Sequence, residues 1–322
     1  MNQDISICVL TENEMGWTEP FELDKVQILD NYYLSAQKSD IAFLKKMDTA
    51  RLLAGFRTTA GIDTKGVRPY GGWEDSLLGG HCVGHYLTAL AQAVKVTGDK
   101  ELKEKSQTLI AGLEECQKKL GTGFLFGAKV EDKEDVEKQF DILEGKKKGE
   151  TWVPWYNMHK VLAGLVDTYK YTGNETALLV AEKLGDWIYA RVSKWDLKTN
   201  QKVLETEYGG MNDCLYELYS YSHNKHHLEA AQKFDEKALF LTAAKGEKNC
   251  LDGKHANTQI PKFIGAIKRY NVLKQLGEAK QEDEAYLADA EKFFEMVVKR
   301  HSFVTGGISV MEHFRKDYHL DE

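Results

Sequence analysis

The segment GGHCVGH, residues 79–85, places His81 and His85 four positions apart at the start of an expected helix. Imidazole and amide groups can hydrogen-bond hydroxyl groups, and aromatic rings can stack on the apolar faces of a sugar. Each segment of this kind, taken alone, also fits a helix cap or a turn. Their recurrence before successive helices favours a shared sugar-binding pocket. The other four are WVPWYNMH (152–159), ETEYGGMN (205–212), DGKHANTQ (252–259) and TGGISVMEHF (305–314).

Glu312, in the last of these segments, is the candidate for proton transfer. It follows a Thr-Gly-Gly turn and stands two residues before an aromatic side chain. Cleavage of a glycosidic bond needs a carboxyl group that protonates the leaving oxygen and then activates water. Its position by itself fits an exposed loop glutamate equally well, so the assignment rests on the pocket around it.

The elements that must position these groups are helical. Only 4 prolines occur in 322 residues, and apolar residues recur at i, i+3, i+4 and i+7 in many windows. We expect one short strand or extended arm at 25–33, and a charge-dense surface insertion at 129–150. The pattern predicts a lone helix and four helical hairpins, nine helices over 41–56, 84–98, 101–120, 158–173, 176–192, 212–222, 227–241, 258–277 and 282–300.

A weak repeat relates these hairpins, at 97–112, 172–187 and 222–237, where a small polar turn ends one helix and opens the next. If the hairpins stack, their first helices run the same way and their amino termini meet at one end. That end would collect the polar and aromatic segments, whereas the turns at the other end (TGD, TGN, SHN) are short and plain. The asymmetry indicates a single functional face.

Composition excludes several other classes of protein. The net charge of −7 disfavours a nucleic-acid partner, and no apolar run approaches the length of a membrane span. The first residues lack the basic flank of a secretory signal, and the five cysteines (Cys8, Cys82, Cys116, Cys214, Cys250) form no Cys-x-x-Cys pair. We therefore expect a cytoplasmic, reducing location without disulfides or a complete zinc site. His81 and His85 also lack the intervening glutamate of a metalloprotease helix.

Seven motifs, in order, resemble the catalytic domain of glycoside hydrolase family 127 and its close relative family 146, the β-L-arabinofuranosidases. The resemblance runs from about residue 22 to the end, and some forms, such as YNMHK, look more like family 146. The motifs are DTARLLAGFRTTAG (48–61), PYGGWED (69–75), GGHCVGHYLTALA (79–91), VPWYNMHKVLAGLVD (153–167), EYGGMND (207–213), HANTQIPKFIGA (255–266) and TGGISVMEHF (305–314).

The resemblance implies an all-α (α/α)6 barrel, a toroid of six helical hairpins, over 36–322 after an N-terminal arm at 1–35. It also implies retaining hydrolysis of terminal β-L-arabinofuranosides on plant-type glycans. Glu312 matches the family's acid/base carboxylate, and His255 matches a histidine that contacts the sugar. The resemblance implies less directly that a second group of residues lines the sugar pocket: His81, His85, Trp155, His159 and Asn212.

In these families the nucleophile is a cysteine held on zinc by further cysteines and a glutamate. Zinc lowers the pKa of a thiol, and the resulting thiolate attacks the anomeric carbon. The Glu-x-Cys segment and the later pair of cysteines are expected after Glu312, yet no cysteine stands in a matching position. Nine expected helices also fall short of the twelve in six hairpins. We therefore expect a barrel that lacks its last helices and its zinc ligands, and a chain that is inactive alone.

Two alternatives stay open at this level. The first is another enzymatic activity on the same toroid, such as that of a uronyl hydrolase or a sugar epimerase. An epimerase would use His81 or His159 as a base facing His255. The other is a non-catalytic helical-repeat module, although its hairpins should be similar at both ends.

Overall fold

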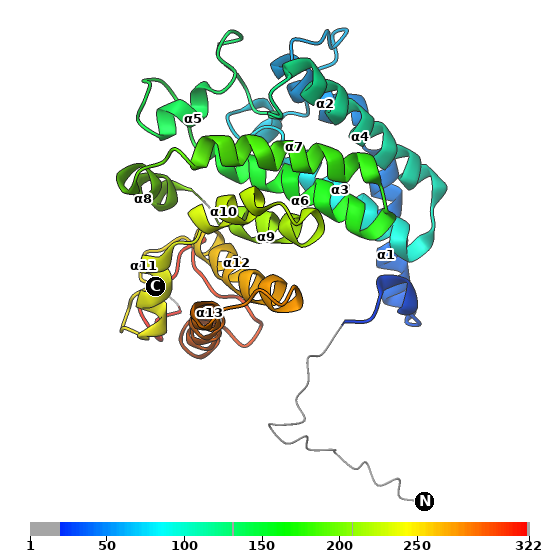
Figure 1. Cartoon of the computed structure of the whole chain (residues 1–322). Helices are drawn as coiled ribbons and strands as arrows, with labels where there is room; N and C mark the ends of the chain where they lie inside the picture. Colours follow the sequence, from blue (N-terminus) through cyan, green and yellow to red (C-terminus); the bar gives the residue numbers. More distant parts are fainter. Residues whose placement is uncertain (1–19, 131, 208, 321–322) are drawn as a thin grey trace, which may run out of the picture.

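The computed structural model describes residues 20–130, 132–207 and 209–320, and Figure 1 shows that they form a stack of helices. No strand occurs among these residues, apart from isolated bridges. The elements are η1 (Leu23–Lys25), α1 (Asn31–Lys46), α2 (Thr49–Thr59), η2 (Gly72–Asp75), α3 (His81–Thr97), α4 (Lys100–Leu120), α5 (Lys138–Leu143), α6 (Pro154–Thr172), α7 (Glu175–Val192), α8 (Leu197–Thr206), α9 (Met211–Ser222), α10 (Lys225–Lys233), α11 (Lys237–Ala244), α12 (Ala256–Gln275) and α13 (Gln281–Arg300).

The helices form two layers of antiparallel pairs. The first helix of each pair packs on the first helix of the next, in the order α3, α6, α9, α12. The second helices α4, α7 and α10 pack on one another in the same order. In Figure 1, α2 and α4 lie at the top and α12 and α13 at the bottom, with α3, α6, α7, α9 and α10 between them. The predicted stacking of helical hairpins is therefore confirmed.

Three of the pairs are joined by the same kind of turn. The residue after the first helix has a positive φ in each case: 66° at Gly98, 67° at Gly173 and 51° at His223. The next residue then caps the second helix with its side chain: Asp99 accepts from Leu102 N, and Asn174 accepts from Ala177 N. Glycine ends a helix in this left-handed conformation at no steric cost, and Asp or Asn satisfies a free N–H group of the next helix. The repeat seen in the sequence is therefore a repeat of turn geometry.

Backbones approach most closely where α3 crosses α6. A Cβ added to Gly84 would overlap the carbonyl group of Lys160, and one added to Gly164 would lie 2.5 Å from the carbonyl oxygen of Gly84. Each glycine therefore faces the backbone of the other helix. Only residues without a Cβ allow this separation, which makes α3 and α6 the most tightly joined pair.

The segment 129–150, expected to be a surface insertion, packs against the core more closely than its charged composition indicates. It carries α5, whose Phe140 is fully buried against Trp155 and Trp187. Arg191 of α7 anchors the same segment through ion pairs, at 2.5 Å to Asp141 and 2.6 Å to Glu144. Burial of one aromatic side chain and these ion pairs fix the segment over the start of α6.

Several expected boundaries were wrong. The expected helix over 41–56 is two helices, α1 and α2, separated at Met47 and Asp48. The expected strand or extended arm at 25–33 is irregular over 26–30 and ends too late, since helix α1 begins at Asn31, where the Asp30 side chain caps it. Of the expected N-terminal arm at 1–35, residues 1–19 lie outside the described residues. The helix over 227–241 is likewise divided into α10 and α11, and α5 and α8 were not predicted.

None of the helices in the described ranges is both long enough and apolar enough to cross a membrane.

Gly84→Ala should destabilise the chain, because the added methyl group forces α3 and α6 apart. Overpacking of this kind costs about 1–3 kcal/mol, more than the roughly 1 kcal/mol that alanine gains over glycine in a helix. Urea denaturation should show a free energy of unfolding lower by about 1–2 kcal/mol. Gln92→Ala, at an exposed position of α3, is the matched control and should leave it within about 0.5 kcal/mol. Equal or greater stability of Gly84→Ala would contradict the crossing.

Candidate functional site

The amino termini of α3, α6, α9 and α12 meet at one end of the stack, which we call the site end. The ring of His81, at the start of α3, lies 5.9 Å from that of Tyr156 in the first turn of α6. A Cβ on Gly210, which precedes α9, would overlap the ring of His159 of α6. The N–H of Gly209 donates to the carbonyl oxygen of Thr258, 3.0 Å away in α12. Four of the five polar segments are thus neighbours, as the sequence pattern predicts.

The fifth segment joins them through backbone hydrogen bonds to the start of α12. Gly253 N–H donates to the carbonyl oxygen of Phe314 at 3.0 Å, and Phe314 N–H donates to that of Lys254 at 2.9 Å. Ala256, the first residue of α12, donates its N–H to the carbonyl oxygen of Glu312 at 2.8 Å. Residues 312–314 therefore lie alongside residues 253–256.

Glu312 and His255 face each other at this junction. The Nε2 atom of His255 lies 3.0 Å from Oε2 of Glu312, and its Nδ1 lies 2.8 Å from Oγ1 of Thr258. Glu312 has a φ of 64°. This left-handed conformation is costly for a residue other than glycine, and residues that adopt it are concentrated at functional sites. Its side chain is 79% exposed. The carboxylate is thus held by one imidazole and open to a ligand, which suits a group that gives and takes a proton.

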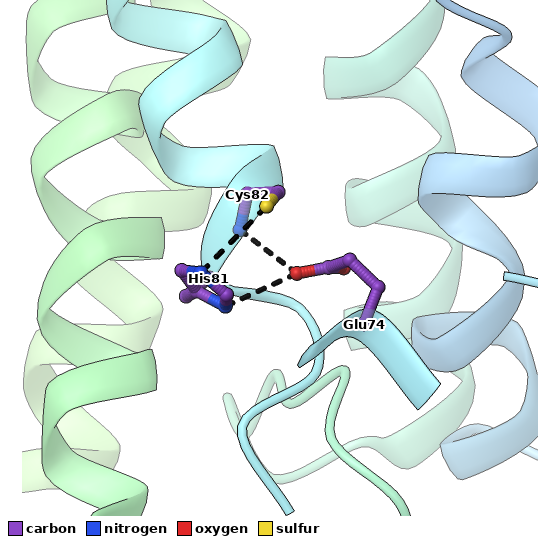
Figure 2. Close-up of side chains that lie close together, drawn as sticks. All are labelled: Glu74, His81 and Cys82. Atoms are coloured by element: carbon purple, nitrogen blue, oxygen red, sulfur yellow. Dashed lines mark hydrogen bonds and ion pairs between the residues drawn. The ribbon is translucent and has the colours of Figure 1, made fainter. Parts of the chain in front are cut away.

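A second group of side chains surrounds the start of α3 and is shown in Figure 2. Glu74 of η2 is buried and accepts from two backbone N–H groups, Gly80 at 3.0 Å and Cys82 at 3.2 Å. Its Oε1 also lies 3.1 Å from Nδ1 of His81. On the other side of the ring, Nε2 of His81 lies 3.7 Å from Sγ of Cys82. The carboxylate, the imidazole and the thiol form one connected cluster.

The charges in this cluster stabilise each other. Burial alone would raise the pKa of Glu74, but the hydrogen bonds from His81, Gly80 and Cys82 lower it below its usual value. Burial would lower the pKa of His81, but Cys82 and Glu74 outweigh burial and raise it to about 10. At neutral pH the structure therefore favours an ionised Glu74 beside a protonated His81.

Farther along α3 and α6, the pKa values of two basic groups, His85 and Lys160, are lowered rather than raised. Burial, together with the charges of Lys160 and His81, lowers the pKa of His85. Burial also lowers the pKa of Lys160, whose Nζ lies 4.8 Å from the ring centre of Tyr156. His85 therefore presents a neutral imidazole near neutral pH, able both to donate and to accept a hydrogen bond from a hydroxyl group.

Three of the residues expected in the pocket are buried instead. Trp155 is fully buried, with its ring centre 4.8 Å from Phe140 and 5.1 Å from Phe234. Asn212 donates through Nδ2 to the carbonyl oxygen of Lys262 at 3.1 Å and so ties α9 to α12. His159 is buried behind Gly210. Their positions give them packing roles: they fix the walls of the site end, and none has an exposed face for a sugar.

Two exposed aromatic residues at the site end were missed. Trp73 and Trp152 lie with their ring centres 5.6 Å apart, and the two residues are 61% and 39% exposed. Trp73 adjoins Glu74, and Trp152 stands two residues before the first residue of α6. The tryptophan in PYGGWED was visible in the sequence, but only its exposure beside a second ring indicates a binding surface.

A family profile described as "Beta-L-arabinofuranosidase, GH127 catalytic domain" matches residues 25–322. The chain belongs to glycoside hydrolase family 127. The profile covers all five polar segments, including both members of the His255–Glu312 pair. No curated protein matches the sequence.

Two solved structures resemble this family 127 chain in fold. One is Ara127N-Se, a GH127 β-L-arabinofuranosidase from Geobacillus stearothermophilus T6, with a TM-score of 0.61 and 17% identity over 92% of this chain and 49% of that one. The other is the GH127 β-arabinofuranosidase BT3674, with a TM-score of 0.61 and 16% identity over 94% of this chain and 47% of that one. Family 127 enzymes are (α/α)6 barrels, so the expected fold class is confirmed. The chain spans about half the length of the structures it matches.

The zinc that the family resemblance implies does not fit the residues around Glu312. Within the described ranges, a single group of three metal-ligating side chains comes close together, and it is Glu74, His81 and Cys82 rather than a set beside Glu312. The Cys250 thiol contacts Met296, and Cys116 and Cys214 are buried. No step of the reaction is therefore assigned to zinc here.

His159 should make folding sensitive to acid. Burial, with Lys160 and His85 nearby, lowers its pKa well below 6.5. The unfolded chain then binds this proton more readily than the fold does, so stability is full above about pH 6.5 and is lost as the pH falls. The loss should approach about 1.4 kcal/mol per pH unit for each histidine that stays neutral in the fold. Denaturant unfolding between pH 7 and 5 should show a shallower slope for His159→Gln.

His226→Gln is the control for this measurement, since that imidazole is exposed in the fold. It should leave the slope unchanged. A His159→Gln variant with the slope of the parent chain would show that His159 is not the group responsible.

Proposed function

We propose that this chain forms the acid/base side and the sugar-binding face of a β-L-arabinofuranosidase, with Glu312 as the general acid/base. The observation that carries this proposal is the His255–Glu312 contact of 3.0 Å at the junction of two polar segments. The carboxylate has the exposure needed to reach a glycosidic oxygen, and its neighbour is a hydrogen-bond partner able to orient it. Substrates would be β-L-arabinofuranosides, as the family profile and the similar structures support, and the family resemblance predicts terminal residues of plant-type glycans.

In this proposal Glu312 donates its proton to the oxygen of the departing group and later takes a proton from water. His255 orients the carboxylate through Nε2, and Thr258 fixes the opposite nitrogen of the same ring. His85 is proposed to hydrogen-bond the sugar hydroxyl groups, whereas both ring nitrogens of His81 already face other groups of the chain. Retention of configuration through a zinc-bound cysteine nucleophile stays a prediction from the family resemblance.

The exposed pair Trp73 and Trp152 supports a platform for the part of the glycan beyond the cleaved sugar. Tryptophan rings bury large apolar areas, and a half-exposed pair at the site end offers a face on which a sugar ring can stack.

Particular residues argue against an epimerase and against a non-catalytic helical-repeat module. An epimerase that used His159 as a base would need that imidazole to reach the sugar, whereas it is buried behind Gly210. A helical-repeat module without catalysis gives no reason for a glutamate held in a left-handed conformation beside His255.

Glu312→Gln should abolish most hydrolysis, because glutamine keeps the shape of the side chain and loses its proton. The assay uses an aryl β-L-arabinofuranoside and the longest form of the protein that its gene encodes. Loss of a general acid/base typically costs 10²–10⁴-fold, so kcat/KM should fall by about that factor. Glu291→Gln, an exposed glutamate on α13, is the control. Turnover within about twofold of the parent enzyme in Glu312→Gln would sink the assignment.

Trp73→Ala should impair arabinofuranosyl oligosaccharides more than a small aryl glycoside. Stacking of an aromatic ring is worth about 0.5–1.5 kcal/mol, so the ratio of the two kcat/KM values should change about threefold to tenfold. Phe294→Ala removes another exposed ring, from α13, and should leave the ratio as it is. Equal effects of Trp73→Ala on both substrates would argue against a platform.

A further inference from the structure

The cluster at the start of α3 has the donor atoms of a metal site. Glu74, His81 and Cys82 each offer one ligand atom, and these three atoms lie within 4.8 Å of one another. The three come from two elements, η2 and α3, so the cluster closes a loop of the chain as well as a group of side chains. Carboxylate oxygen, imidazole nitrogen and thiolate sulfur are the three donor types that zinc accepts.

The hydrogen bonds around His81 leave the correct nitrogen for a ligand. Its Nδ1 lies 2.7 Å from the carbonyl oxygen of Leu78 and 3.1 Å from Glu74. A metal-binding histidine usually donates one ring N–H to a carbonyl or a carboxylate, which fixes the ring and exposes the lone pair of the other nitrogen. That other atom, Nε2, is the one that faces the thiol of Cys82.

The spacing between these two donors also suits a tetrahedral ion. Zinc bonds of about 2.0 Å to nitrogen and 2.3 Å to sulfur, at a tetrahedral angle, place the two ligands about 3.5 Å apart. The observed distance from His81 Nε2 to Cys82 Sγ is 3.7 Å. Glu74 already holds its carboxylate beside the same ring, and Oε2 keeps a lone pair besides the one that accepts the Gly80 N–H.

We propose that Glu74, His81 and Cys82 form a three-ligand site for a zinc-class divalent cation at the start of α3, with a fourth position left to water. Three protein ligands and one open position are the pattern of zinc sites that exchange a water or bind a further ligand. The ion would replace the proton on His81 and the proton of the Cys82 thiol and would tie η2 to α3. The site is distinct from the cysteine set that the family resemblance implies, which belongs beside Glu312.

Cobalt(II) is the probe, because it takes zinc sites and reports a thiolate ligand by a charge-transfer absorption band. One equivalent of Co²⁺ added to the reduced, metal-free protein should produce this band, and one equivalent of Zn²⁺ should remove it. Cys82→Ser should abolish the band, and His81→Gln should weaken metal binding at least about tenfold. Circular dichroism and urea unfolding check that both variants fold.

Cys250→Ser and Cys8→Ser are the matched controls, since each removes one other thiol, and both should keep the band. Absence of a thiolate band in the parent protein, or its survival in Cys82→Ser, would overturn the proposal. The metal alone is measured, so failure here leaves the hydrolysis by Glu312 untouched, and loss of activity in Glu312→Gln says nothing about this site.

Discussion

The close crossing of α3 and α6 is the constraint on which the site end depends. Gly84 and Gly164 let the two backbones touch, and this contact sets how far the first turn of α3 stands from the first turn of α6. His81 and Tyr156 become neighbours because their helices cross a turn farther along the chain. A larger separation would move the histidines of α3 away from α6, whatever the chemistry of the segments before them.

The two ends of the stack satisfy their helix termini in different ways. At the plain end, Asp99, Asn174 and Asn224 cap the helices that they precede, so each turn is complete by itself. At the site end the helices have no such local cap. Distant groups replace it: Glu74 accepts from the start of α3, and Glu207 accepts from Trp155 N at 3.1 Å. Because these caps come from other segments of the chain, their hydrogen bonds bring those segments together at the site end.

This difference explains what the sequence could and could not predict. The helical periodicity and the local turns at 97–99 and 172–174 depend on neighbouring residues, so the hairpins and their stacking were predicted correctly. Trp155 was expected in the pocket because an aromatic residue in a polar segment fits a sugar site, yet its burial depends on Phe140 and Phe234 from distant segments. The role of Glu74 was missed for the same reason, since its partners follow six to eight residues later across a turn. In helix α1 only the carboxyl-terminal part, with Ile41 and Leu44, packs against the core, so the periodic pattern indicated a helix from residue 41 and missed the first ten residues of α1.

Two carboxylates at the site end show why only one suits proton transfer. Glu74 is buried, accepts from two backbone N–H groups and faces His81, and these contacts lower its pKa. A group so stabilised as an anion resists taking a proton, and protonating it would uncap α3. Glu312 keeps its side chain in solvent and meets one imidazole, while its backbone oxygen, rather than its carboxylate, receives the N–H that anchors it to α12. Gaining or losing a proton therefore leaves the backbone of Glu312 in place, as a group that alternates between acid and base requires.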